Sequence, residues 1–98
     1  MTTLYLRPEQ LDKHLAPTLR NAKGDAWSRV ASVIGRSQQL DLPLASTRHW
    51  LRVRGDVEVQ QLAGSYDLIR HISRKVAKYR AASADPSLPV RYAVAHML

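Results

Sequence analysis

Apolar residues recur at helical spacing in the first part of the chain. Leu11, Leu15 and Leu19 lie four residues apart and therefore share one side of a helix that begins near Pro8. Pro17 falls inside this helix, although it lacks the N–H that the helical ladder requires. We therefore expect the helix to kink at Pro17 or to divide near Leu15.

A second helix is predicted from Ala26 to about Leu40. Asp25 precedes it and is a favourable N-cap, because its carboxylate can accept from a backbone N–H of the first turn. A wide apolar stripe runs along this segment and comprises Trp27, Val30, Ala31, Val33 and Ile34. Gly35 follows the stripe, and we expect it to weaken the helix or to end it.

A third helix is predicted between residues 43 and 55. Asp41 is expected to cap it, Pro43 suits its first turn and Gly55 ends it. The side that we expect to face inward comprises Leu44, Thr47, Trp50 and Leu51. Most of the opposite side is polar, with Arg48, His49 and Arg52.

The fourth helix is predicted to be the longest, from its cap at Asp56 to about Ala82, with Gly64 as its weak point. Its apolar positions alternate at three and four residues and comprise Val59, Leu62, Tyr66, Ile69, Ile72, Val76 and Tyr79. Pro86 and Pro89 stop this helix, and residues 90–98 are then expected to form a short apolar helix.

Residues Thr2 to Leu6 are the one strand-prone stretch, and a single strand cannot form a sheet. We expect them to form a short extended arm or to pair with the same stretch of another chain. The chain of 98 residues has the size of one domain. The fold class that follows is all-α: a compact bundle of four to five helices, forming a single domain over residues 1–98.

Composition excludes several kinds of site. The chain has no cysteine, so it has no disulfide, thiolate metal site or cysteine nucleophile. The four histidines lie too far apart in sequence for the spacing of a helical metal site, and we expect neither a metal nor a cofactor. No apolar run approaches the roughly twenty residues of a membrane span, and the first fifteen residues lack the pattern of a signal peptide. These features predict a cytoplasmic protein.

Charge is the unusual property of this sequence. Fifteen Lys and Arg face eight Asp and Glu, for a net charge of +7, which favours an anionic partner such as nucleic acid. In the third helix the candidate contacts are Thr47, Arg48, His49, Arg52 and Arg54. In the fourth helix they are Arg70, Arg74 and Lys78 at i, i+4 and i+8, with Lys75. Arg36 is a further candidate phosphate contact.

The spacing of Ala31 and Gly35 resembles that of helix-turn-helix DNA-binding proteins, which place a small residue four positions before a turn glycine. A turn of standard length would place Asp41 and Pro43 inside the recognition helix. The motif therefore requires a lengthened turn, with residues 43–54 as the recognition helix in the major groove. The alternative is that Ala31 and Gly35 are small residues where two helices cross.

Near the end of the sequence, Arg91 and His96, separated by four residues, resemble the active-site motif of HEPN ribonucleases, small helical proteins that cleave RNA. In that family the residue after the arginine is commonly polar, whereas this chain has Tyr92. No serine–histidine–aspartate arrangement or phosphate-binding glycine loop is present either. We predict that the protein is not an enzyme.

Aromatic residues decide between duplex and single-stranded partners. Trp27 and Trp50 lie on apolar stripes, and Tyr66 and Tyr79 lie on the predicted seam, so we expect no aromatic surface for single strands. The sequence thus predicts a transcriptional regulator of phage or plasmid type that binds duplex DNA as a homodimer. The alternative is a non-enzymatic inhibitor or assembly factor that docks on a larger, acidic protein that handles nucleic acid.

Overall fold

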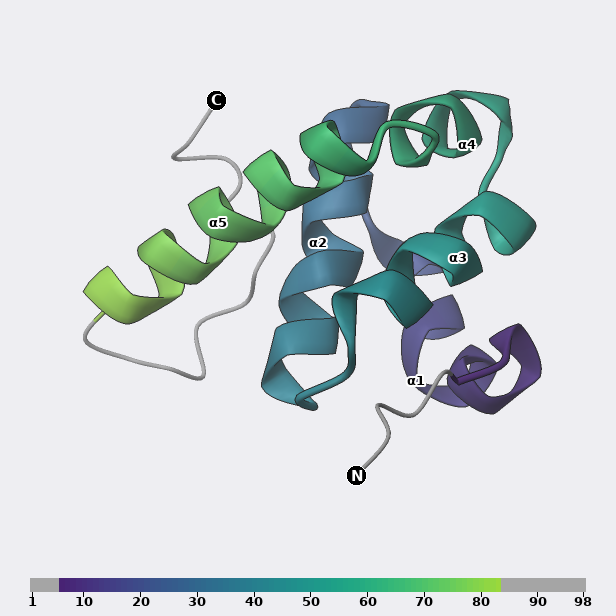
Figure 1. Cartoon of the computed structure of the whole chain (residues 1–98), viewed down its shortest axis with the longest axis horizontal. Helices are drawn as coiled ribbons and strands as arrows, with labels where there is room; N and C mark the ends of the chain where they lie inside the picture. The colour runs from purple at the N-terminus through teal and green to yellow at the C-terminus, as the bar shows by residue number, and fades with distance from the viewer. Residues whose placement is uncertain (1–5, 84–98) are drawn as a thin grey trace.

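A computed structural model describes residues 6–83, which form five α-helices and no strand (Figure 1). The helices are α1 (Pro8–Asn21), α2 (Ala26–Gln39), α3 (Leu44–Arg54), α4 (Val57–Ala63) and α5 (Tyr66–Ala82). This confirms the all-α prediction. Most of the predicted arm, the helix predicted over residues 90–98, and the pair Arg91 and His96 lie outside the described residues.

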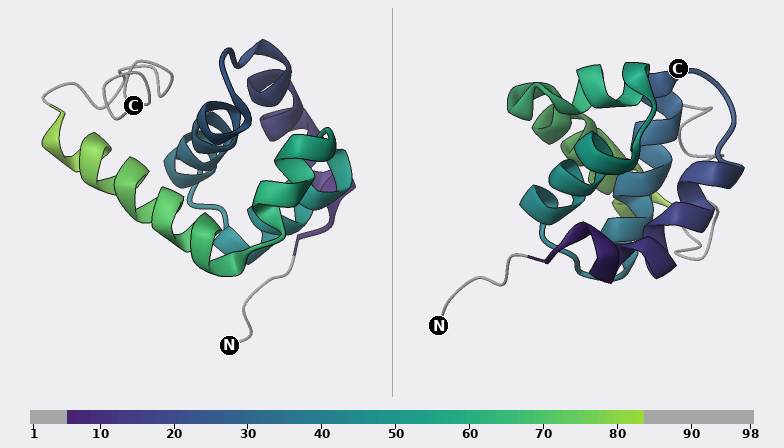
Figure 2. Two further views of the ribbon diagram at one scale, coloured as in Figure 1. Left: turned by 90° about the horizontal axis from the view of Figure 1, so that it is seen from above. Right: turned by 90° about the vertical axis from the view of Figure 1, so that its right-hand side faces the viewer.

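Helix α2 lies at the centre and packs against each of the other four helices (Figure 1). Nine of its fourteen residues are buried. A single apolar stripe would bury fewer, and the larger number arises because other helices cover α2 on several sides. Every helix contributes a side chain with at most 1% of its surface exposed: Leu15, Ile34, Trp50, Val59 and Ile72. Figure 2 shows α5 along one side of the molecule and α1 on the other, with α2 between them.

Aspartate side chains fix the beginnings of α2 and α4. Asp25 accepts a hydrogen bond from the Ser28 N–H at 2.9 Å, and Asp56 accepts from the Val59 N–H at 3.1 Å. Both predicted caps are therefore confirmed. Asp56 also forms an ion pair with Arg29, which links the start of α4 to α2.

The prediction of one continuous helix from residue 56 to residue 82 is wrong. Ser65 has an extended backbone, and its hydroxyl accepts from the Leu68 N–H at 3.2 Å, so it begins a new helix as an N-cap. Gly64 ends α4 just before it. The change of direction removes Tyr66 from the apolar seam, and 42% of its surface is exposed.

At three other positions a local expectation is wrong at least in part. Gly35 does not end α2, which continues to Gln39. Pro17 does not divide α1, because the apolar side chains of α1 pack against the core on either side of the lost hydrogen bond. Asp41 does not cap α3; Pro43 has the N-cap position, and Asp41 instead has a left-handed backbone with φ of 54° in the turn.

Candidate nucleic-acid interface

Thr47 belongs to the core. None of its surface is exposed, and its hydroxyl donates to the Pro43 carbonyl at 3.3 Å and contacts the hydroxyl of Ser37 on α2. This corrects the expectation that Thr47 lies at the edge of a DNA-contacting face. The helical pattern was right in placing Thr47 on the inward side of α3, beside Trp50 and Leu51.

Arg48 is held in place by main-chain acceptors. Its Nε donates to the carbonyl of Ala63 at 2.8 Å, and its Nη2 donates to that of Gly64 at 3.0 Å. These carbonyls lie at the C-terminal end of α4, where a cation is favourable. A guanidinium has five N–H groups, so three donors of Arg48 remain after these two bonds. If α3 is the recognition helix, Arg48 would contact a base with a guanidinium that two carbonyls already hold in place.

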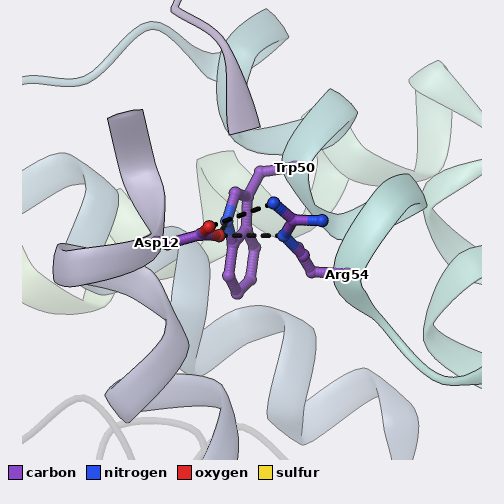
Figure 3. A network of polar contacts seen from close by, with 3 residues as sticks. All are labelled: Asp12, Trp50 and Arg54. Atoms are coloured by element: carbon purple, nitrogen blue, oxygen red, sulfur yellow. Dashed lines mark hydrogen bonds and ion pairs between the residues drawn. The ribbon is translucent and has the colours of Figure 1, made fainter. Parts of the chain in front are cut away.

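Arg54 is neutralised within the molecule. Its guanidinium donates to both carboxylate oxygens of Asp12 on α1, at 2.9 and 3.0 Å, and the indole of Trp50 donates to the same carboxylate at 2.8 Å (Figure 3). Hydrogen bonds from Arg54 and then Trp50 hold the pKa of Asp12 below its ordinary value. The main role of Arg54 is therefore to join α1 to α3, and it contributes little to an external cationic surface.

The exposed side of α5 is basic. Arg70, Arg74 and Lys78 are exposed on the side of the helix away from buried Ile72, and Lys75 is exposed at the border of that side. The two ion pairs of residues 6–83 are Arg29–Asp56 and Arg54–Asp12, so none of these four cations forms an ion pair with a described acid. The one acid of α5 is exposed Asp67, three residues before Arg70. Arg70, Arg74 and Lys78 form a stripe about 12 Å long, from the rise of 1.5 Å per residue. We call these three residues the α5 stripe.

The remaining candidates differ in their surroundings. Arg52 is exposed on α3, and His49 is half-buried on the same helix. Arg36 is half-buried near the end of α2 and donates to Gln39 of its own helix at 3.3 Å. Arg52 is therefore the α3 cation best placed to extend a basic surface.

Tyr66 brings the two basic faces together. The guanidinium carbon of Arg48 lies 5.4 Å from the centre of the Tyr66 ring, and that of Arg70 lies 6.0 Å from it. Both distances are within the range of a cation–π contact. The tyrosine thus connects a cation of α3 to the start of the α5 stripe. Sequence reasoning missed this role because it assigned Tyr66 to the buried seam. The signal that could have revealed it is Gly64, a helix breaker, followed directly by Ser65, a good N-cap.

The turn between α2 and α3 does not use the predicted glycine. Gly35 and Ala31 are both buried inside α2, and the residue with positive φ in the turn is Asp41. Placing Gly35 in the turn of a helix-turn-helix was therefore wrong. The burial of Ala31 and Gly35 agrees with the alternative, that they are small residues in the packed centre of the bundle. A variant helix-turn-helix made of α2 and α3 stays a prediction.

The described residues offer little for other chemistry. They contain no group of three or more His, Asp or Glu side chains placed to hold a metal ion. None of the helices over residues 6–83 has both the length and the apolar character to cross a bilayer. An open hollow lies between the starts of α2, α4 and α5, with Trp27, Leu62 and Leu68 in its wall and Asp25 and Glu58 beside them. No family model, curated protein or solved structure shows significant similarity to this chain.

Proposed function

We propose that this protein is a non-enzymatic DNA-binding regulator that contacts duplex DNA through the α5 stripe and the adjoining face of α3. The observation that supports this most strongly is the lack of acidic partners for the exposed cations of α5. Arg29 and Arg54 show that this chain does pair arginines with aspartates where the pair joins two helices. Arg70, Arg74, Lys75 and Lys78 form no ion pair with another helix among the described residues, yet all four are exposed.

Each basic residue has a distinct part in this proposal. The α5 stripe contacts successive phosphates, because its side chains are long, exposed and aligned along one helix. Arg52 of α3 contacts the DNA beside it. Arg48 has a positioning role, since its bonds to the carbonyls of Ala63 and Gly64 hold α3 against the α4–α5 junction. This replaces the expectation that Arg48 enters the major groove together with His49 and Arg52.

A cytoplasmic homodimer is the form in which we propose that it acts. The apolar composition of residues 90–98 supports self-association, and two-fold symmetry would suit a DNA site with two half-sites about one helical turn apart. Light scattering of the full chain, alone and with DNA, tests this part of the proposal: a monomer under both conditions contradicts it.

The salt dependence of duplex binding tests the proposal. If the α5 stripe neutralises three phosphates, the affinity should fall about 40-fold between roughly 50 and 200 mM salt, from a slope of about −0.9 per phosphate. Lys78→Ala should reduce that slope by about 0.9 and weaken binding to all sequences alike. Fluorescence anisotropy with a labelled duplex measures both quantities.

Lys13→Ala is the matched control, because it removes the same charge from an exposed position of α1, a helix that does not contact α5. It should leave the salt slope unchanged. The proposal is wrong if the protein binds no duplex at low salt, or if the two variants weaken binding equally.

Docking on a larger protein is the second candidate function. Val53 and Val57 favour it, since they are 44% and 68% exposed at the corner between α3 and α4. A pull-down from lysate treated with nuclease separates the two functions. A partner that is retained after nuclease treatment, and lost in Val57→Asp, supports docking; loss of every partner after nuclease supports DNA binding.

A further inference from the structure

Tyr66 is the first residue of α5 and lies one helical turn before Arg70 on the same exposed side. It therefore extends the α5 stripe, so that an aromatic ring precedes three cations at four-residue spacing. The Ser65 cap fixes the start of the helix through its bond to the Leu68 N–H. The position of the ring relative to the stripe is thus set by the helix itself.

Tyr66 is more exposed than the other aromatic residues that the structure describes. Trp50 is 1% exposed and bonded to Asp12, and Trp27 is half-buried against the core. Tyr66 keeps 42% of its surface exposed even with two guanidiniums beside it. The structure thus places an exposed aromatic ring beside basic residues. The sequence did not predict this, because it assigned Tyr66 to the buried seam.

The two arginines beside the ring are held differently. Arg48 is fixed by two carbonyls, so it stays beside the ring whether or not a ligand is bound. Arg70 is exposed on α5. It contacts the ring, and it forms no hydrogen bond or ion pair with the described residues. A flat aromatic ligand can therefore displace Arg70, and the freed guanidinium can then bind a phosphate next to that ligand.

We propose that Tyr66 stacks on an unpaired nucleic-acid base where a DNA duplex ends, while the α5 stripe contacts the adjoining backbone. This inference rests on the proposed DNA binding and makes it more specific. Inside a duplex the base faces are already stacked on one another, and a protein ring reaches them only by unstacking a base step, which costs a few kcal/mol. An unpaired base at the end of a duplex offers its face without that cost. Stacking of bases on protein aromatics is tolerant of sequence, so a single tyrosine can take any unpaired base.

The experiment compares two labelled DNAs by fluorescence anisotropy: a blunt duplex, and the same duplex with a short thymine overhang. The full-length protein should bind the overhang DNA about tenfold more tightly, the effect typical of one stacked base. Tyr66→Leu keeps an apolar side chain but lacks the π-face, so it should lose this preference and bind the two DNAs with equal affinity. Tyr66→Phe should retain the preference, and Lys78→Ala should weaken both DNAs equally.

The possible failures of the two proposals are distinct. Blunt-duplex binding without any gain from the overhang overturns the role of Tyr66 and leaves the proposed function intact. Failure to bind either DNA at low salt overturns both. If Tyr66→Leu does not fold, as judged by circular dichroism, the wild-type protein still decides the question with a 2-aminopurine base in the overhang. Quenching of its fluorescence on binding supports stacking, and unchanged fluorescence contradicts it.

Discussion

The hydroxyls of Ser37 and Thr47 form a pair buried between α2 and α3, with 2% and 0% of these residues exposed. Thr47 donates to the Pro43 carbonyl, so the hydrogen between the two hydroxyls belongs to Ser37. Thr47→Val preserves the shape of the side chain and removes the acceptor. The Pro43 carbonyl still accepts from the backbone N–H of residue 47, at 3.1 Å, and only the Ser37 hydroxyl loses its partner.

The expected magnitude follows from this geometry. A buried hydroxyl without a partner costs about 1–3 kcal/mol. Ser37 can rotate toward a carbonyl of its own helix, as Ser32 does when it donates to the Ser28 carbonyl at 3.1 Å. We therefore expect the free energy of unfolding to fall by about 1 kcal/mol, which corresponds to about 4–8 °C in Tm for a small domain.

The double variant Thr47→Val with Ser37→Ala provides the decisive comparison. It removes both members of the pair, so it should cost less than the sum of the two single variants, as expected for groups in direct contact. Urea denaturation followed by circular dichroism measures all four proteins, and the m-values should be equal. Because Thr47 is buried, none of these variants should alter the affinity of the folded protein for DNA.

Two results would refute this reasoning. Additive losses in the cycle would mean that Ser37 and Thr47 do not interact. Normal stability together with weaker DNA binding by Thr47→Val would mean that Thr47 faces the ligand, as the sequence alone had suggested.

Two further predictions concern stability. Gly55→Ala should cost about 1–3 kcal/mol in urea denaturation, because a Cβ there would collide with Val59 and lie 2.6 Å from the Leu51 carbonyl oxygen; an unchanged midpoint would contradict the packing at this corner. Hydrogen bonds from Arg54 and Trp50 favour the carboxylate of Asp12 and lower its pKa in the folded state. The resulting stability is fully present above the ordinary aspartate pKa, and it is lost as the pH falls through the lowered pKa of the folded state. Asp12→Asn should therefore flatten the acid side of the stability profile below about pH 4, with the midpoint of urea denaturation as the readout; a profile as steep as that of the wild type would contradict it.

Local patterns were enough to predict much of the fold. The apolar spacing around Leu11 and Leu15, the caps at Asp25 and Asp56, and the end of α3 at Gly55 all agree with the structure. These features depend on residues within one or two helical turns, so the sequence contains their full physical cause. The exposed basic side of α5 follows from the same periodicity.

The candidate surface depended on contacts between distant residues. Arg54 is neutralised by a residue 42 positions away, and Arg48 is fixed by a carbonyl 15 positions away. Helical periodicity predicts which side of a helix is exposed, but it does not reveal which cation meets an acid or a carbonyl of another helix. Tyr66 became exposed because the chain changes direction at Ser65. The sequence alone thus determined the helices and the excess of charge, and only the packing of the helices decided which charges remain available to a ligand.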